Sequence, residues 1–119
     1  MNKEGRIVKL GHPFKTSWDN IAENVHLTAV NKGWWDSERS DGEIIALIHS
    51  EASEALEALR QGNPADEKCP EFSSVEVELA DVIIRIMDFS EARGFDVAGA
   101  LLQKIEFNKT RPHKHGKKF

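Results

Sequence analysis

Apolar residues recur at helical spacing in four stretches of the chain, and no stretch shows the sustained alternation of a strand. The stretches cover about residues 17–31, 41–60, 73–93 and 96–108. The first contains one apolar stripe, formed by Trp18, Ile21, Ala22, Val25 and Ala29. This pattern predicts an all-α fold, a four-helix bundle with short connections.

Capping residues mark the ends of the predicted helices. Ser40–Glu43 and Ser73–Glu76 have the Ser-x-x-Glu spacing of a capping box, in which each side chain accepts a hydrogen bond from a free backbone amide. Gly62 and Gly94 stand where the second and third helices should stop, and Asp96 is placed to cap the fourth. The four helices therefore have local start and stop signals of their own.

The third stretch carries charges where a buried helix should have none. Apolar side chains occupy about two thirds of its circumference, which is typical of a helix buried on nearly all sides. One narrow charged line remains, at spacings of three, seven and ten residues, and consists of Glu78, Asp81, Arg85 and Asp88. This line predicts carboxylates that point toward other helices.

The second stretch repeats the conflict. On a helical projection Glu51 falls inside the apolar arc and Glu54 at its edge, so both should point toward the core side of the helix. Glu57 falls on the opposite, solvent-facing side. Buried carboxylates without a partner repel one another and are costly, so two such pairs suggest a divalent cation that supplies the missing charge. Oxygen ligands alone favour Mg²⁺, or Mn²⁺, over zinc. The alternative is that both pairs belong to solvated faces, or that Arg85 neutralises one acid.

Length and composition limit the remaining possibilities. The 119 residues fit one domain, and the single cysteine, Cys69, excludes a disulfide framework and a cysteine-based zinc cluster. No run of about 18 apolar residues and no signal peptide is recognisable, so we expect a cytoplasmic protein without membrane contact. We expect residues 1–16 to form an N-terminal extension, residues 17–112 the helical domain and residues 113–119 a basic tail.

The net charge of −4 conceals an asymmetry. Residues 109–119 contain five cations and no acid, so the rest of the chain carries −9. A few cations on so acidic a body make a poor surface for a phosphate backbone, and no nucleic-acid partner is expected.

The acid motif resembles that of a known family. Glu51-x-x-Glu54 followed by Glu78-x-x-Asp81 is similar to the ExxE…ExxD signature of the MazG-like all-α nucleoside triphosphate pyrophosphohydrolases. The stretch from Lys104 through Asn108-Lys109-x-Arg111-Pro112 is similar to the C-terminal phosphate-binding segment of that family. The resemblance extends over about residues 32–119.

The resemblance implies hydrolysis of the α–β phosphoanhydride of a nucleoside or deoxynucleoside triphosphate, with Mg²⁺, to the monophosphate and pyrophosphate. Such an activity can serve to clean the nucleotide pool. By this resemblance the metal ligands are Glu51, Glu54, Glu78 and Asp81, and Glu51 and Glu54 are the catalytic residues, Glu54 as a group that can orient the attacking water. Phosphate binding falls to Asn108, Lys109 and Arg111, with Arg85 as a further candidate. The family has another acid before the first ExxE, where this chain has Leu47 and Ser50, which leaves the number of metal ions open.

Two adjacent tryptophans, Trp34 and Trp35, follow Gly33 between the first two predicted helices. They either pack in a core or subunit contact, or one of them stacks on the nucleobase. The apolar circumference of the third helix exceeds what a monomer of short helices covers, so a homo-oligomer, a dimer or a tetramer, is expected.

Two other functions remain open from the sequence. One is a phosphoribosyl-ATP pyrophosphohydrolase, which differs in substrate alone. The other is a non-enzymatic helical binding module whose basic tail contacts nucleic acid. The second of these predicts that Glu51→Gln leaves function intact.

Overall fold

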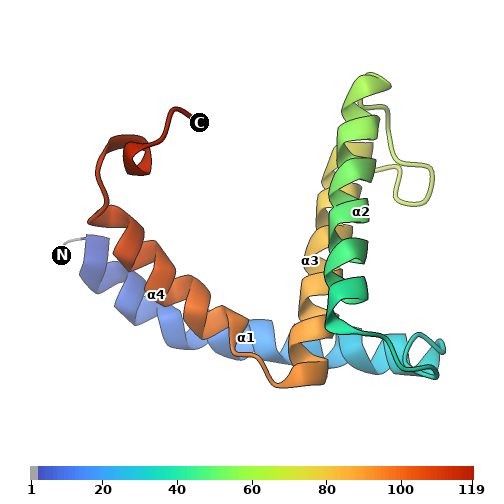
Figure 1. Ribbon diagram of the computed structural model, residues 1–119, viewed down its shortest axis with the longest axis horizontal. Coiled ribbons are helices and arrows are strands. Elements are labelled where there is room, and N and C mark those ends of the chain that lie inside the picture. Colours follow the sequence, from blue (N-terminus) through green and yellow to red (C-terminus); the bar gives the residue numbers. More distant parts are fainter. Residues whose placement is uncertain (1–2) are drawn as a thin grey trace.

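The computed structural model describes the backbone of residues 3–119 and the side chains of residues 11–119, so Met1 and Asn2 lie outside the described part. Figure 1 shows the chain as four helices followed by a short 3₁₀ turn. Their bounds are α1 Lys3–Asn31, α2 Asp41–Arg60, α3 Ser74–Arg93, α4 Val97–Lys109 and η1 His113–Gly116. Within residues 3–119 the structure has no strand, and the only β-bridge joins Ala65 to Ser73. The predicted all-α class is confirmed for this part of the chain.

The first helix is longer than predicted. It begins at Lys3 rather than Ser17 and includes Pro13, so the expected N-terminal extension forms helix from Lys3 onward. The predicted start followed from the apolar stripe, which begins at Trp18, and a proline inside a helix is uncommon because it lacks a backbone N–H. A Cβ added at Gly11 would lie 3.4 Å from Leu102 Cδ1, so α4 packs closely on this early part of α1. That tertiary contact is not encoded in the local sequence.

The helices α2 and α3 form an antiparallel hairpin whose ends follow the predicted caps. Ser40 and Ser73 are the N-caps, and at Ser73 both halves of the capping box with Glu76 are present. Gly94 ends α3 in the left-handed conformation at φ 70°, where a residue with a Cβ would be strained. The local signals therefore set the ends of both helices that carry the acidic residues.

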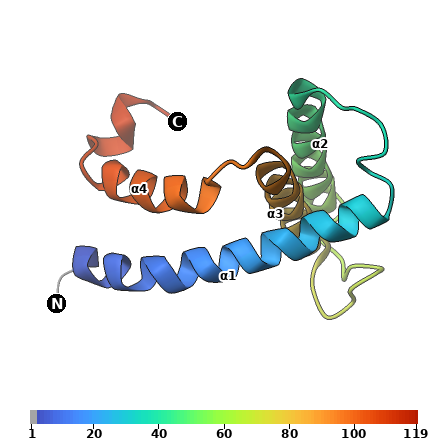
Figure 2. The ribbon, with the colours of Figure 1, turned by 90° about the horizontal axis from the view of Figure 1, so that it is seen from below.

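The helices pack in two groups that share α1. Figures 1 and 2 show the α2–α3 hairpin standing on the C-terminal half of α1, while α4 lies along its N-terminal half. The chain turns from α3 into α4 at Gly94–Asp96, and Asp96 caps α4 through the amide of Gly99. The C-terminus lies on the side of the molecule formed by α1 and α4.

The core of a single chain is thin. Among the described side chains the buried apolar residues are mostly small: Ala22, Ile44, Ala55, Ala58, Met87 and Ala98. Many large apolar side chains are exposed, including Leu56 and Leu59 on α2 and Leu79 and Ile83 on α3. The radius of gyration is 16.9 Å, against about 13–14 Å for a compact domain of this length. No described helix combines the length and the apolar character that crossing a membrane requires.

Candidate functional site

Three of the four predicted acidic ligands lie together between α2 and α3. Glu51 comes from the middle of α2, and Glu78 and Asp81 come from the first half of α3. One carboxylate oxygen of each lies within 4.8 Å of the other two. The spacing of three places Glu78 and Asp81 on one face of α3, and the hairpin brings that face to Glu51. We call these residues the acidic trio.

The proximity of these acids disfavours their charged forms. Burial, and then the negative charges of Asp81 and Glu51, raises the pKa of Glu78 above its ordinary value. Burial and the charge of Glu51 likewise raise the pKa of Asp81, against the opposing effect of Lys68 and Arg85. A cation between the carboxylates would favour their charged forms and lower both pKa values. The donor set and its electrostatics therefore fit a hard divalent cation.

Arg85 neutralises one member of the trio. Its Nε donates a hydrogen bond to Glu51 Oε1 at 2.7 Å, and the two side chains are 28% and 16% exposed. The guanidinium also lies 6.0 Å from the centre of the Trp34 ring. The sequence offered the alternative that Arg85 neutralises one acid, and the structure shows this ion pair at Glu51. The pKa values of Glu78 and Asp81 are still raised.

Glu54 stands apart from the trio. It is exposed on α2, whereas the helical projection predicted that it points toward the core side together with Glu51. Its charge still contributes to the raised pKa of Glu78, so it lies near that carboxylate. Its roles as a ligand and in orienting water stay predictions.

A cavity of about 270 Å³ adjoins the trio. It is lined by α1, α2, α3 and the connection between α1 and α2. Its charged lining consists of three acids, Glu51, Asp81 and Asp88, and three cations, Lys32, Arg39 and Arg85. Trp34 lines it too, together with Val25, Thr28, Ala29 and Ile84. The cavity therefore has both an acidic and a basic part.

Asp88 joins α3 to α1 and to the connection that follows α1. Its carboxylate accepts hydrogen bonds from Trp35 Nε1 at 3.0 and 3.1 Å and lies 2.7 Å from His26 Nδ1. The Trp35 ring packs edge-on against His26, and the guanidinium of Arg39 lies over it at 4.5 Å. Trp35 is thus held by the fold, whereas Trp34 is 56% exposed and lines the cavity. Of the two predicted base-binding residues, Trp34 is the one placed to contact a ligand.

The predicted phosphate-binding segment lies on the other arm of the molecule. Asn108 and Lys109 end α4, and Arg111 follows it. Lys109 Nζ pairs with Glu106 Oε1 at 2.9 Å, and the Arg111 guanidinium lies 5.9 Å from the Phe107 ring centre. Figures 1 and 2 show the end of α4 well away from the α2–α3 hairpin. Within one chain these residues do not join the acidic trio.

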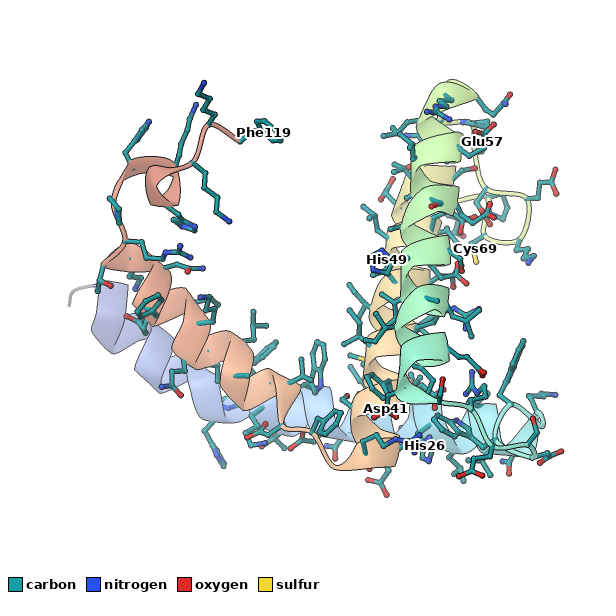
Figure 3. All side chains as sticks on the ribbon, viewed as in Figure 1. His26, Asp41, His49, Glu57, Cys69 and Phe119 are labelled. Atoms are coloured by element: carbon teal, nitrogen blue, oxygen red, sulfur yellow. The ribbon has the colours of Figure 1, made fainter. Side chains whose placement is uncertain are left out.

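The remaining residues of chemical interest lie apart from the cavity lining. Figure 3 shows His49 on the outer side of α2, Cys69 in the loop between α2 and α3, and His26 beneath the base of the hairpin near Asp41. His49 and Cys69 are exposed. Neither has a place in the site.

Sequence reasoning missed part of the cavity. Lys32 and Arg39, which line the cavity, and His26, which contacts Asp88, were not singled out, although Lys32 and Arg39 flank the tryptophan pair in the chain. Charges on both sides of two adjacent tryptophans were the available signal. His26 gave none, because its position on α1 becomes meaningful only when Asp88 packs against it.

No family model, no curated protein and no solved structure matches this chain. The resemblance of its paired acid motif to the MazG-like enzymes therefore remains an expectation drawn from the residues themselves.

Proposed function

We propose that the protein is an Mg²⁺-dependent nucleoside triphosphate pyrophosphohydrolase that cleaves the α–β phosphoanhydride to give the monophosphate and pyrophosphate. The observation that carries the proposal is the convergence of Glu51, Glu78 and Asp81 beside a cavity that also presents cations and an exposed tryptophan. The paired ExxE and ExxD motifs, and their resemblance to the MazG-like family, support the same assignment.

The residues of the site can each be assigned a role in phosphoanhydride hydrolysis. That reaction depends on positioning and charge neutralisation more than on covalent help from the protein. Mg²⁺, or Mn²⁺, held by the trio would neutralise phosphate charge and activate water. Arg85 orients Glu51 through its hydrogen bond of 2.7 Å, and Trp34 offers a ring face to a nucleobase. Glu54, which is exposed on α2 outside the trio, is the candidate for orienting the attacking water.

We further propose that the working unit is a homo-oligomer. The chain exposes 8998 Å², whereas a compact monomer of this mass exposes about 6,500 Å². The excess of roughly 2,500 Å² per chain matches what obligate interfaces bury. The exposed apolar residues at helical spacing on α2 and α3 supply the surface: Ile45, Leu56, Leu59, Leu79 and Ile83. A second copy packed there would also provide the bulk of the core that one chain lacks.

Product analysis tests the proposed reaction. The protein is incubated with Mg²⁺ and a panel of ribonucleoside triphosphates, deoxynucleoside triphosphates and phosphoribosyl-ATP, and pyrophosphate and inorganic phosphate are assayed separately. We expect pyrophosphate and a monophosphate, and we expect Asp81→Asn to lower kcat/KM by about 100-fold or more, because it removes a charged metal ligand. Glu57→Gln is the control, since Glu57 is an exposed carboxylate on α2 whose described side-chain partners are Gln61, by a hydrogen bond, and Arg60, at 3.9 Å.

Each alternative gives a different result. Release of inorganic phosphate would contradict α–β cleavage. Hydrolysis of phosphoribosyl-ATP alone would change the assigned substrate and leave the proposed α–β cleavage unchanged. Equal rates for the wild type and Asp81→Asn would refute the role of the trio.

A further inference from the structure

The three cations that line the cavity, Lys32, Arg39 and Arg85, differ in whether a carboxylate already hydrogen bonds to them. Arg85 is committed to Glu51 by the hydrogen bond of 2.7 Å. Arg39 is not committed in this way: its nearest carboxylate oxygen, Asp88 Oδ2, is 4.0 Å from Nη2, beyond hydrogen-bond distance. Within residues 11–119 no carboxylate oxygen lies within 4.0 Å of Lys32 Nζ. Among the described residues, these two cations of the cavity lining therefore have no carboxylate within hydrogen-bond distance.

Arg39 is unusual because it is also largely buried. Its side chain is 14% exposed, and its Nε, which is shielded from solvent, has no hydrogen-bond acceptor among the described residues. A buried donor without a partner costs about 1–3 kcal/mol. The guanidinium carbon lies 4.5 Å from the centre of the Trp35 ring, and this cation–π contact restrains the position of the group before any ligand arrives. Asp88 attracts Arg39 across 4.0 Å but does not hydrogen bond to it, and its carboxylate already accepts from Trp35 Nε1 and contacts His26 Nδ1.

The position of these charges suits one kind of ligand. The cavity lining contains Glu51 and Asp81 of the acidic trio and also Lys32 and Arg39. A polyanion bound there could meet both a cation held by the trio and the cations of the protein. Arginine in a fixed orientation can bind phosphate oxygens in a bidentate way, and lysine adds a point charge. A volume of about 270 Å³ is just below the roughly 300–1,000 Å³ of pockets that hold a whole ligand, so it suits a phosphate chain with the base outside, against Trp34.

We infer that Lys32 and Arg39 form the phosphate-binding side of the cavity and hold the triphosphate chain of the substrate, an assignment that rests on the proposed function. They take the role that the sequence assigned to Lys109 and Arg111, which lie on the other arm of the chain. Both new residues flank the tryptophan pair, so one short segment, residues 32–39, supplies the contacts to phosphate and to base.

Inorganic tripolyphosphate tests this assignment without turnover of a nucleotide. Its dissociation constant is measured by calorimetry with Mg²⁺ for the wild type, Arg39→Gln, Arg39→Lys and Lys32→Gln. We expect Arg39→Gln to weaken binding by about 10- to 100-fold, which corresponds to about 1.4–2.8 kcal/mol, and Lys32→Gln by about 5- to 10-fold. Arg39→Lys keeps the charge but loses the bidentate geometry, so it should fall between the wild type and Arg39→Gln.

Arg60→Gln is the matched control. It removes one positive charge from a residue that is 68% exposed in the last turn of α2. A loss of affinity in Arg60→Gln as large as in Arg39→Gln would mean that only net charge matters, and it would overturn the assignment. Because Arg39 is largely buried, thermal melting checks that each variant folds, and the exposed Lys32 gives a reading that does not depend on Arg39.

The outcomes separate this inference from the proposed function. Tripolyphosphate binding that is lost in the variants of Lys32 and Arg39, with no pyrophosphate released from any nucleotide, would refute the hydrolysis and support the phosphate site. Nucleotide hydrolysis with tripolyphosphate affinity unchanged in these variants would refute the phosphate site alone. Loss of affinity in a Lys109→Gln/Arg111→Gln double variant instead would return the role to the C-terminal segment and overturn the inference. No tripolyphosphate binding by the wild type would overturn it as well.

Discussion

At the scale of single residues, the acids of the site are of two kinds. Glu51 has a cationic partner, because Arg85 Nε donates to it at 2.7 Å. Glu78 and Asp81 have raised pKa values from burial and from neighbouring negative charge. In the absence of a cation, their ionised forms oppose folding, whereas the ionised form of Glu51 is needed by Arg85.

Neutral substitutions should therefore separate these two kinds in protein freed of metal by chelation. Asp81→Asn removes a disfavoured charge, and we expect a rise in Tm of about 2–4 °C, corresponding to about 0.5 kcal/mol. Glu51→Gln deprives the half-buried Arg85 of its charged partner, and we expect a fall in Tm. Calorimetry at pH 7.5 measures both. With Mg²⁺ added, Asp81→Asn should lose its advantage, since the wild type gains more from the cation.

The difference in stability between Asp81→Asn and the wild type should also depend on pH, in a direction set by the raised pKa of Asp81. A carboxyl whose pKa is raised by folding stabilises the folded state at low pH and loses that contribution as pH rises through the raised pKa. The advantage of Asp81→Asn should thus be full at pH 7.5 and should fade as pH falls toward 3.8, the ordinary pKa of aspartate. An advantage independent of pH would show that packing, and not charge, distinguishes the variant.

At the scale of elements, the geometry of the site depends on how α2 turns into α3. Asn63 lies in the left-handed region at φ 50°, and its Oδ1 accepts a hydrogen bond of 2.8 Å from the amide of Val75 near the start of α3. The amide of Asn63 in turn donates to the carbonyl of Ala58 in α2. One residue thus connects the end of one acid-bearing helix to the beginning of the other.

Substitutions at Asn63 should report this connection. Asn63→Ala loses the acceptor and places a Cβ without polar compensation in the left-handed region, and we expect a loss of about 1–3 kcal/mol in the free energy of unfolding. Asn63→Gly loses the acceptor alone and should cost less. Asn63→Asp keeps an acceptor at a helix N-terminus and should remain close to the wild type. Urea unfolding measures all three, and equal losses in Ala and Asp variants would refute the capping role.

The elements also show what the sequence could and could not predict. Helix ends with their own caps, such as Ser73 and Gly94, were predicted because capping is local. The inward phase of Glu51, Glu78 and Asp81 followed from helical periodicity. The predicted start of α1 was wrong, because the apolar stripe begins only at Trp18, whereas the earlier turns pack against α4. The contacts of residues 32–39 with α3 could not be predicted, because they depend on long-range packing in a segment without periodicity.

At the scale of the whole molecule, the accessible surface of one chain exceeds that of a compact monomer of the same mass. The exposed apolar residues of α2 and α3 and the accessible area of 8998 Å² favour a second copy of the chain as the cover. A dimer that buried the entire excess would have an interface of about 5,000 Å², at the upper end of the obligate class. A tetramer would divide the same area between two contacts.

Sedimentation equilibrium tests the assembly. We expect the wild type to be a dimer or a tetramer, and we expect Leu79→Ser/Ile83→Ser to dissociate at least 100-fold more readily, since it removes two exposed apolar side chains from one face of α3. Phe119→Ser serves as the control, because this terminal side chain is fully exposed. A monomeric wild type at micromolar concentration would refute the proposal.

The shared helix α1 has a consequence for how the chain opens. The α2–α3 hairpin rests on its C-terminal half and α4 on its N-terminal half, with little contact between the two groups. Amide hydrogen exchange should therefore follow a hierarchy, in which α4 and the early turns of α1 exchange first and α2, α3 and the later turns of α1 exchange only on global opening. Detachment of α4 would leave the hairpin that carries the acidic trio intact. The chain thus consists of two cooperative units joined through one continuous helix.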